Sequence, residues 1–349
     1  MASLFQIKIK RVHKIVVTGG AGYIGSHTVV ELINSGFEPI IIDNYSNSNP
    51  EVIKNLEKLC DRTIIHYNAD CNDEKALTKI FSEHRISGVI HFAAYKAVGE
   101  SVEKPLMYYE NNIGSLITLL KVMDQFDVGT IVFSSSCTVY GQPDQLPVSE
   151  EAPVMPANSP YGYTKQVCEN ILKDTVYSNS KFRTVLLRYF NPIGAHPSSL
   201  IGELPIGVPN NLVPFITQTG AGWRKELTIF GDDYNTSDGT CVRDYIHVVD
   251  LAIAHVKAFD WLEKNDDSLG VFNVGTGDGS SVLETINAFE KVSGNKLPYI
   301  IGGRREGDIE KIWASNEKVV RELKWKAKYS LADAMDHAWK WQLTLGDKK

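Results

Sequence analysis

The stretch SPYGYTKQ, residues 159 to 166, places two tyrosines and one lysine close enough to act together. Prolines interrupt the chain just before Tyr161, and proline is tolerated in a first helical turn, so a helix can begin here. Residues four apart share a helix face, so Tyr161 and Lys165 point to one place while Tyr163 points elsewhere. A phenol beside an ammonium group can act as a general base. The alternative is a tyrosine packed on its own helix beside a solvated lysine, because this spacing is common by chance.

A run of three serines leaves the predicted strand in TIVFSSSCTVYG, ahead of that helix. Its hydroxyls could do no more than cap backbone groups. Ligands of a doubly wound sheet bind at the carboxyl ends of the strands, however, and the run stands at such an end. The serines, Tyr161 and Lys165 therefore form a candidate Ser/Tyr/Lys catalytic set.

The first predicted strand runs into TGGAGYIGSH, which spaces Gly19, Gly22 and Gly25 as GxxGxxG and also contains GxGxxG. Glycine at a strand-to-helix turn lets a pyrophosphate approach, and the helix N-terminus supplies amide donors. Asp43 ends the next strand, where it can accept hydrogen bonds from a ribose diol and would repel a 2′-phosphate. The pattern thus predicts a binding site for NAD rather than NADP. The alternative is a tight turn that binds no cofactor. Asp70, after the third strand, could hold the adenine amine or be an acid of a surface loop.

Strand and helix patterns alternate along this part of the chain. Runs rich in β-branched residues predict buried strands beginning at residues 14, 39, 63, 88, 130 and 184. Helical patterns cover 23–36, 73–84, 103–126 and 161–178. Such alternation favours right-handed crossovers and a parallel sheet covered on both faces. The sequence therefore predicts a Rossmann-like, doubly wound α/β fold.

The composition changes after the sixth strand. Residues 192–240 are rich in Gly, Pro and Asn, which is typical of irregular structure in a smaller domain. The later patterns IHVVDLAIAHVKAFDWL and VFNVGTG predict a helix and a strand that return to the first domain. We assign 1–190 to an NAD-binding domain, with 241–275 returning to it. The remaining 191–240 and 276–349 form a smaller C-terminal α/β substrate domain.

Composition and charge narrow the class of protein. A chain of 349 residues suits two domains with sizeable cores, and its net charge of -6 argues against nucleic acid as a partner. No apolar run approaches a membrane span, and the basic start MASLFQIKIKRVHK lacks an apolar core or cleavage site. Five cysteines form no CxxC pair and nine histidines no HExxH, so we expect free thiols and no metal. We expect a cytoplasmic protein.

Several motifs taken together give a more specific result. The segments TGGAGYIG, HFAAYKAVGES, SSSCTVYG, PYGYTK, RYFNPIGAHPS, VPNNL, GTCVRDYIHVVD and RREGD resemble those of the UDP-glucose 4-epimerases, which are extended short-chain dehydrogenases/reductases. The resemblance runs from about Lys14 to about Gln342. It implies a nucleotide-sugar site in the smaller domain and a homodimer joined through helices 103–126 and 161–178. Cys137 stands where the family usually has alanine, and we assign no chemistry to it.

The resemblance also implies roles for residues. Tyr161 takes the proton of the sugar 4-hydroxyl, the Lys165 ammonium and the nicotinamide charge lower its pKa, and Ser136 hydrogen-bonds the 4-oxygen. The implied cofactor contacts are Gly19, Gly22, Tyr23, Ile24, Gly25, Asp43, Asn44, Asn47, Ser48, Asp70, Cys71, Phe92, Ala93, Ala94, Lys96, Asn111, Ser134, Tyr161, Lys165, Tyr189 and Phe190. The implied substrate contacts are Lys96, Ser136, Tyr161, Asn191, Asn211, Leu212, Phe230, Arg243, Arg305, Asp308 and Ile312.

Related activities provide the alternatives. The nearest are nucleotide-sugar 4,6-dehydratases and decarboxylases of the same family. The dehydratases carry Thr-Asp-Glu before Val-Tyr-Gly, whereas this chain has Ser136, Cys137 and Thr138, without a carboxylate to drive elimination. Another NAD-dependent epimerase, acting on UDP-N-acetylhexosamines or on UDP-pentoses or uronates, is a second alternative. A non-catalytic NAD-binding regulator would be expected to have lost the Tyr/Lys pair, which is intact here. The arginines of RREGD could also form a surface salt-bridge patch.

The prediction about which sugar the protein prefers depends on Ile312. In the resembling family, the corresponding position lines the pocket beside carbon 2 of the sugar. Isoleucine is stiff and bulky there, so we expect UDP-glucose and UDP-galactose to be preferred over their N-acetylated counterparts. The alternative is that Ile312 is an ordinary core residue.

Overall fold

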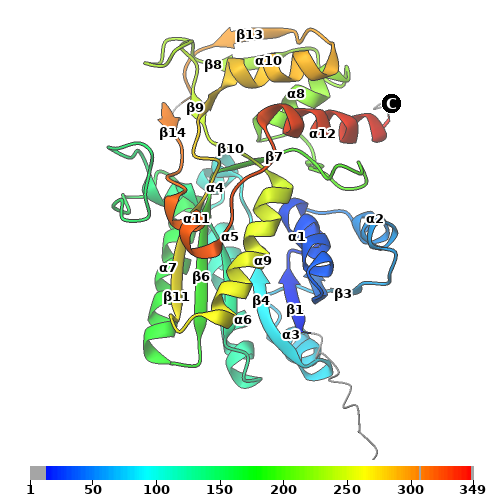
Figure 1. Cartoon of the computed structure of the whole chain (residues 1–349), viewed down its shortest axis with the longest axis vertical. Helices are drawn as coiled ribbons and strands as arrows, with labels where there is room; N and C mark the ends of the chain where they lie inside the picture. Colours follow the sequence, from blue (N-terminus) through cyan, green and yellow to red (C-terminus); the bar gives the residue numbers. More distant parts are fainter. Residues whose placement is uncertain (1–12, 306–307, 347–349) are drawn as a thin grey trace, which may run out of the picture.

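A computed structural model describes residues 13–305 and 308–346 of the chain (Figure 1). Its largest element is a seven-stranded sheet in which every neighbouring pair of strands is parallel. In spatial order the strands are β11 (Leu269–Val274), β6 (Arg183–Tyr189), β5 (Thr130–Ser136), β4 (Ile86–His91), β1 (Lys14–Thr18), β2 (Glu38–Asp43) and β3 (Ile65–Asn68). The predicted Rossmann-like fold is confirmed.

Helices cover both faces of this sheet, because successive side chains of each strand point to opposite faces. Ile15 and Val17 pack on one face with α1, α2, α9 and α11, whereas Val16 packs on the other with α3, α6 and α7. The helices of this part are α1 (Tyr23–Asn34), α2 (Glu51–Cys60), α3 (Glu74–Glu83), α4 (Val98–Glu103), α5 (Pro105–Tyr108), the π-helix η1 (Tyr109–Ile113), α6 (Gly114–Gln125), the 3-10 helix η2 (Cys137–Tyr140), α7 (Pro160–Ser178), α9 (Val248–Lys264) and α11 (Glu317–Leu323).

Two helical segments differ from the sequence prediction. The predicted helix 103–126 is divided, because the chain passes through α5 and a π-helical turn before α6 begins at Gly114. Helix α2 was not predicted at all. Its apolar residues do recur at helical spacing, since Ile53 and Leu56 are buried and Val52 and Leu59 pack against the same core.

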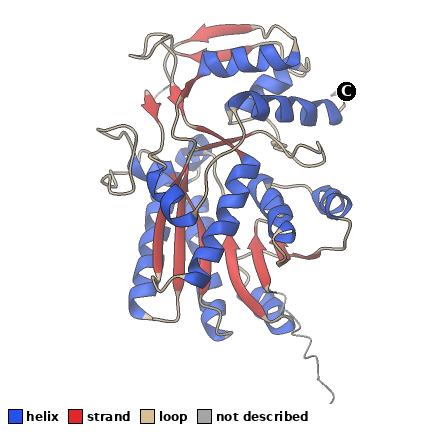
Figure 2. Cartoon of the chain, viewed as in Figure 1, coloured by secondary structure: helices blue, strands red, loops and turns tan. Residues whose placement is uncertain are grey.

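A smaller part of the chain lies over the carboxyl ends of the large sheet (Figure 2). Its core contains Ile216, Phe289 and Met335, one from each of its three longer helices. Short strands connect the two parts, and β7 follows directly from β6. The elements are β7 (Asn191–Ile193), α8 (Leu212–Gly220), β8 (Leu227–Phe230), β9 (Val242–Arg243), β10 (Tyr245–His247), β12 (Ser280–Ser281), α10 (Val282–Ser293), β13 (Tyr299–Gly302), β14 (Lys311–Ile312) and α12 (Leu331–Thr344).

The division into domains stays a prediction, but two contacts bear on it. Strand β11 pairs with β6 over its full length, as expected for a segment that returns to the large sheet. Helix α11 packs against α9, and its Val319 and Leu323 join the core of the large sheet although they lie within 276–349. Within 13–305 and 308–346, no helix is both long and apolar enough to cross a membrane. The same residues contain no cluster of His, Cys, Asp or Glu suited to a metal ion.

Candidate active site

The glycine turn is packed so closely that side chains cannot replace its hydrogens. Gly19 has φ +68°, and a Cβ there would lie 2.9 Å from the Ala93 nitrogen; at Gly25 a Cβ would lie 2.2 Å from the Gly19 oxygen. Helix α1 follows with Gly22 at its N-cap, which offers no side-chain cap. The first-turn amides at Tyr23 and Ile24 are therefore available to an anion, as a dinucleotide pyrophosphate requires.

Asp43 is held in place at the end of β2. Its Oδ1 accepts hydrogen bonds from the Tyr45 amide at 2.9 Å and the Ser48 hydroxyl at 2.8 Å, and its Oδ2 accepts from the Ala21 amide at 3.0 Å. A carboxylate has about four acceptor positions. The side chain therefore keeps capacity for a ligand hydroxyl, and the predicted contact Ser48 serves to orient it.

The ends of β2 and β3 meet beside Asp43. Asn44 donates to Asp70 at 2.8 Å, and Asp70 also accepts the Asn72 amide at 2.7 Å. Cys71 is buried under this turn, whereas Asn47 is exposed. The structure thus brings Asn44 and Asp70 together at the sheet edge, where an adenosine moiety is expected.

The candidate catalytic residues lie on β5 and α7. Ser159 caps α7 by accepting the Gly162 amide at 3.1 Å, which starts the helix where Tyr161 and Lys165 share a face. The Lys165 side chain is buried, and its Nζ donates to the Ser134 carbonyl at 2.7 Å and lies 6.0 Å from the Tyr161 ring centre. The Ser136 hydroxyl interacts with the Tyr161 phenol in the direction that lowers its pKa.

The electrostatics differ from the sequence argument in one respect. Burial raises the pKa of Tyr161 to about 12, and the Ser136 hydrogen bond only partly offsets that rise. Burial also lowers the pKa of Lys165 to about 8. We expected Lys165 to lower the pKa of the phenol, but its ammonium group is directed at the Ser134 carbonyl. Without a further positive charge the phenol stays neutral near pH 7.

Apolar and aromatic groups line the strand ends between these clusters. Ala93 and Ala94 follow β4 with Phe92, whose ring lies 4.6 Å from the His255 ring. Ser134 and Tyr189, at the ends of β5 and β6, share a hydrogen bond between their hydroxyls. The other predicted residues of this region are Phe190, which is buried, and Asn111, which donates to Asn112 at 3.0 Å.

Arginines gather around one carboxylate in the smaller part. Arg305 donates to Asp308 at 2.7 Å and lies over the Phe230 ring at 5.6 Å, and Arg243 lies 3.7 Å from the same Asp308 oxygen. The alternative of a surface salt-bridge patch stays open for the RREGD arginines, because Arg305 is 59% exposed and paired with Asp308, whereas Arg243 is largely buried. Asn191, on β7, donates its amide to the Asp244 carbonyl at 3.0 Å nearby.

Ile312 lies beside Arg243, because β14 pairs with β9. Its side chain is 2% exposed and belongs to a buried apolar cluster with Val139, Tyr140 and Phe190. This packing favours the alternative of a core residue, so its role in sugar choice stays a prediction.

Comparisons with known proteins agree with this geometry. A family model described as GDP-mannose 4,6 dehydratase matches residues 16–337. The chain is 52% identical over 330 residues to UDP-glucose 4-epimerase 2 of Arabidopsis thaliana, covering 94% of each protein. It is 51% identical over 330 residues to UDP-glucose 4-epimerase of Bacillus subtilis, covering 94% of this chain and 96% of that one. The chain belongs to the UDP-glucose 4-epimerase family.

Solved structures of this family have the same fold. The UDP-glucose-4-epimerase of Stenotrophomonas maltophila, with bound NAD and formylated UDP-arabinopyranose, has a TM-score of 0.93 and 46% identity, covering 95% of this chain and 98% of that one. The enzyme of Bifidobacterium longum, in complex with NAD+ and UDP, has a TM-score of 0.92 and 47% identity with the same coverage.

The sequence did not predict a buried network of side chains that lies behind the candidate catalytic residues. The Ser135 hydroxyl donates to Glu169 at 2.6 Å, and Arg188 grips the same carboxylate with Nε at 2.8 Å and Nη2 at 2.6 Å. Arg188 also donates to the Tyr140 hydroxyl at 3.0 Å. Glu169 lies four residues after Lys165 on the same helix face, a spacing that could have pointed to it.

Glu203 is a further site residue that the sequence did not predict. Its carboxylate accepts hydrogen bonds from Lys96 at 3.2 Å and from Asn211 at 2.6 Å, two residues predicted to contact ligands. Leu212 follows as the first residue of α8. No local pattern marks Glu203, because its partners lie in other segments of the chain.

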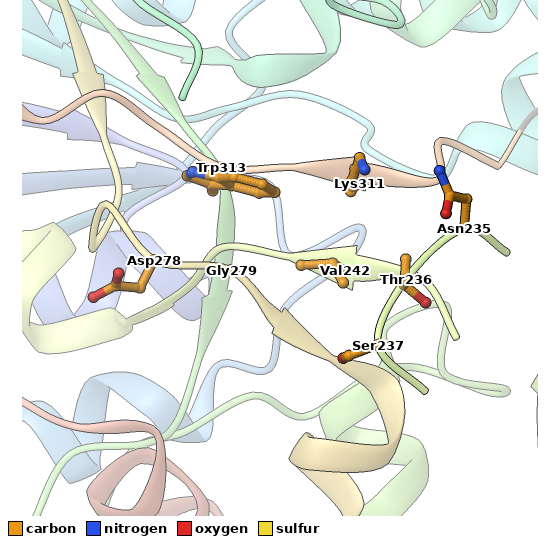
Figure 3. A pocket seen from close by; sticks show the side chains of 8 residues that line it. All are labelled: Asn235, Thr236, Ser237, Val242, Asp278, Gly279, Lys311 and Trp313. Carbon is orange, nitrogen blue, oxygen red and sulfur yellow. The ribbon is translucent and has the colours of Figure 1, made fainter. Parts of the chain in front are cut away.

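A surface pocket of about 470 Å³ lies away from these residues (Figure 3). Lys311, Trp313 and Val242 line it, whereas Arg243 and Ile312 alternate with them along β9 and β14. Side chains alternate between the faces of a sheet, so the pocket opens on the face opposite Arg243. It contains none of the predicted site residues and is separate from the candidate active site of this epimerase family member.

Proposed function

We propose that this protein interconverts UDP-galactose and UDP-glucose by transient oxidation at carbon 4, with NAD as a resident cofactor. The observation that carries the proposal is the convergence of Tyr161, Lys165 and Ser136 at the carboxyl edge of the sheet that also carries the glycine turn. The relatives that cover 94% of the chain are named for this reaction.

The residues around the glycine turn fit NAD. Gly19 and Gly25 leave no room for side chains, and the open N-terminus of α1 faces the turn, as a pyrophosphate needs. Asp43 would accept a hydrogen bond from the adenosine ribose and repel a 2′-phosphate. When bound, NAD supplies reversible acceptance of a hydride from carbon 4 of the sugar.

Tyr161 is the proposed base. Its phenol oxygen takes the proton of the 4-hydroxyl as the carbon–hydrogen bond at carbon 4 breaks, and returns it after the 4-keto sugar has turned over in the pocket. Ser136 donates to the developing 4-oxygen. The positive charge of the oxidised nicotinamide would supplement Lys165, whose ammonium group is directed at the Ser134 carbonyl, and would lower the phenol pKa from its buried value of about 12. The proton therefore leaves only when the cofactor is in place.

The smaller part would hold the nucleotide. Arg243 and Arg305 can grip diphosphate oxygens, because a guanidinium fork suits them, and Asp308 orients both groups. The remaining proposed contacts are Asn191 on β7, Asn211 and Leu212 at the start of α8, and Phe230 at the end of β8.

Incubation of the purified protein with UDP-galactose tests the proposal. We expect UDP-glucose to form without added NAD, and about one NAD(H) per chain to be released on denaturation, because the cofactor is regenerated in every cycle. No conversion even with added NAD would contradict the proposal. A 4-keto-6-deoxy product would instead indicate a dehydratase, which the absence of a carboxylate at Cys137 disfavours.

We also propose a homodimer joined through the segments 103–126 and 161–178. Large apolar side chains are exposed on both, including Leu106 at 78% and Tyr177 at 94%, which is unusual unless a partner covers them. Light scattering should give twice the chain mass, and Leu106→Lys should give the monomer. A wild-type mass of one chain would overturn the proposal. The cytoplasmic location stays a prediction of the sequence.

A further inference from the structure

Glu203 joins the two sides of the candidate site. Its Oε1 accepts hydrogen bonds from Asn211 Nδ2 at 2.6 Å and from Lys96 Nζ at 3.2 Å. Lys96 follows β4 of the large sheet, whereas Asn211 precedes α8 of the smaller part. The Glu203 side chain is largely buried, so its bond to Asn211 is partly shielded from water and constrains Asn211 more than a surface pair would, whereas the Lys96 side chain is 49% exposed.

The backbone of Glu203 is fixed by helix α12. Trp341 donates its indole N–H to the Glu203 carbonyl at 3.0 Å. The indole also lies against Gly202, where a Cβ would stand 2.4 Å from Trp341 Cδ1. Gly202 is in turn bridged to Ala195 in antiparallel fashion. The carboxylate is therefore held in position before any ligand arrives.

The contact with Glu203 changes what Asn211 does for helix α8. Asparagine at an N-cap ordinarily accepts a first-turn amide, but Asn211 occupies the N-cap of α8 and makes no such bond. Its side chain is turned toward Glu203 instead. Pro214 has no N–H, so the amides of Leu212 and Val213 are the first-turn donors left without a side-chain cap.

We propose that Glu203 is a positioning residue of the site: it keeps the Asn211 side chain off helix α8 and directs Lys96, so that both are arranged for the diphosphate of the nucleotide sugar before it binds. The inference rests on the proposed function. Groups that are ordered in advance lose less freedom on binding, which favours affinity. Glu203 touches none of Tyr161, Lys165 and Ser136, so it acts on binding rather than on the chemical step.

Kinetics and calorimetry of Glu203 variants test this role. In Glu203→Ala the released Asn211 can cap Val213 and compete with the ligand. We expect KM for UDP-galactose and Kd for UDP to rise about five- to tenfold, as the typical strength of a cap implies. The turnover number kcat should stay within about twofold of wild type, since uniform binding alone is lost.

Two further substitutions separate positioning from general damage. Glu203→Gln keeps an acceptor for both partners, so its KM and Kd should return to within about twofold of wild type. Glu203→Asp is too short to reach both partners and should resemble Glu203→Ala, which keeps the test available if the alanine variant does not fold. In an Asn211→Ala background, Glu203→Ala should lose the part of its effect that passes through Asn211, and the effect that remains measures the contact with Lys96.

Glu290→Ala is the matched control. Glu290 also pairs with a lysine, Lys296 at 2.5 Å, but on α10 and away from the site, so KM and Kd should not change. The inference would be overturned if Glu203→Ala left KM and Kd unchanged. It would also be overturned if Glu203→Gln raised KM and Kd as much as Glu203→Ala does. Because Kd for UDP does not require turnover, wild-type protein that binds UDP but fails to epimerise would contradict the proposed function alone.

Discussion

At the scale of single residues, two tyrosines only two positions apart on α7 have different surroundings. Tyr161 is the candidate base, and Tyr163 lies at the surface. The Tyr161 phenol interacts with Ser136, and its ring lies 6.0 Å from the Lys165 ammonium, whereas Tyr163 is 50% exposed and its ring lies 6.1 Å from that of Tyr109. Burial keeps the pKa of Tyr161 at about 12, so the phenol is protonated until a cation arrives. Under the proposed mechanism, proton removal is therefore tied to the oxidised cofactor.

Tyr161→Phe should lower kcat for UDP-galactose by about 10²- to 10⁴-fold, the usual loss when a general base is removed. The bound NAD(H) content should stay unchanged, because the glycine turn and Asp43 are untouched. Tyr163→Phe is the matched control and should keep kcat within about twofold. Equal losses in the two variants would show that the base is misassigned.

Ile312→Ser tests the prediction on sugar choice. If Ile312 fills the space beside carbon 2, the variant should accept UDP-N-acetylglucosamine about 10- to 100-fold better while retaining UDP-galactose activity. The packing of Ile312 suggests the opposite result, a loss of roughly 2–4 kcal/mol of stability without a change of specificity. Ratios of kcat/KM for the two sugars, together with urea unfolding, distinguish the outcomes.

At the scale of elements, the turns and breaks between helices and strands place the site. The π-helix η1 interrupts the predicted long helix and carries Asn112 inward. Asn112 donates to the Tyr95 carbonyl at 3.0 Å and to the Thr164 hydroxyl at 3.1 Å, and it accepts the Tyr95 amide at 2.8 Å. One residue thus ties the loop after β4 to α7 beside Lys165. Such π-helical turns are frequent at functional sites.

Gly25→Ala should disrupt the junction of β1 and α1. The new Cβ would lie 2.2 Å from the Gly19 oxygen, so the backbone must shift, which costs about 1–3 kcal/mol of stability. The same shift should reduce the NAD(H) recovered per chain at least tenfold. Gly99→Ala, on α4, meets nothing within 4 Å and should change neither quantity. A full complement of NAD(H) in Gly25→Ala would count against a cofactor at this turn.

At the scale of the whole molecule, histidines gather where the smaller part meets α1. His247 Nε2 and His337 Nδ1 are 3.0 Å apart, and the rings of His27 and His196 lie 6.2 Å apart. Burial lowers the pKa of His27 to about 3, and burial together with the neighbouring His337 lowers that of His247 to about 3. The imidazoles of His27 and His247 are therefore uncharged at neutral pH.

Acidification should weaken the protein through these groups. Their folded-state pKa lies below the unfolded value near 6.5, so the unfolded chain binds more protons between about pH 6.5 and pH 3. The free energy of unfolding should thus fall as the pH drops through that window, by about 2 kcal/mol per such histidine at pH 5. Urea unfolding followed by tryptophan fluorescence at pH 7 and pH 5 measures the difference.

His27→Gln should reduce that pH 7 to pH 5 difference by about 2 kcal/mol, because one titrating group is gone. His66→Gln removes an exposed histidine and should leave the difference unchanged. The same reduction in both variants would show that the buried imidazole is not responsible.

The sequence by itself determined the features that depend on local spacing. Strand and helix periods predicted the parallel sheet, the glycine pattern predicted the turn before α1, and the four-residue separation of Tyr161 and Lys165 placed them on one face of α7. These follow from backbone geometry within a few residues, so no distant contact can change them easily.

Only the tertiary structure decided which distant groups meet. Glu169 and Arg188 come together behind the serine run, and Glu203 lies between Lys96 and Asn211, because strands and loops far apart in the chain converge at one sheet edge. Burial, which no local pattern records, also set the pKa of the Tyr161 phenol above its ordinary value. Side-chain partners and burial are properties of packing, and packing is fixed when the whole chain has folded.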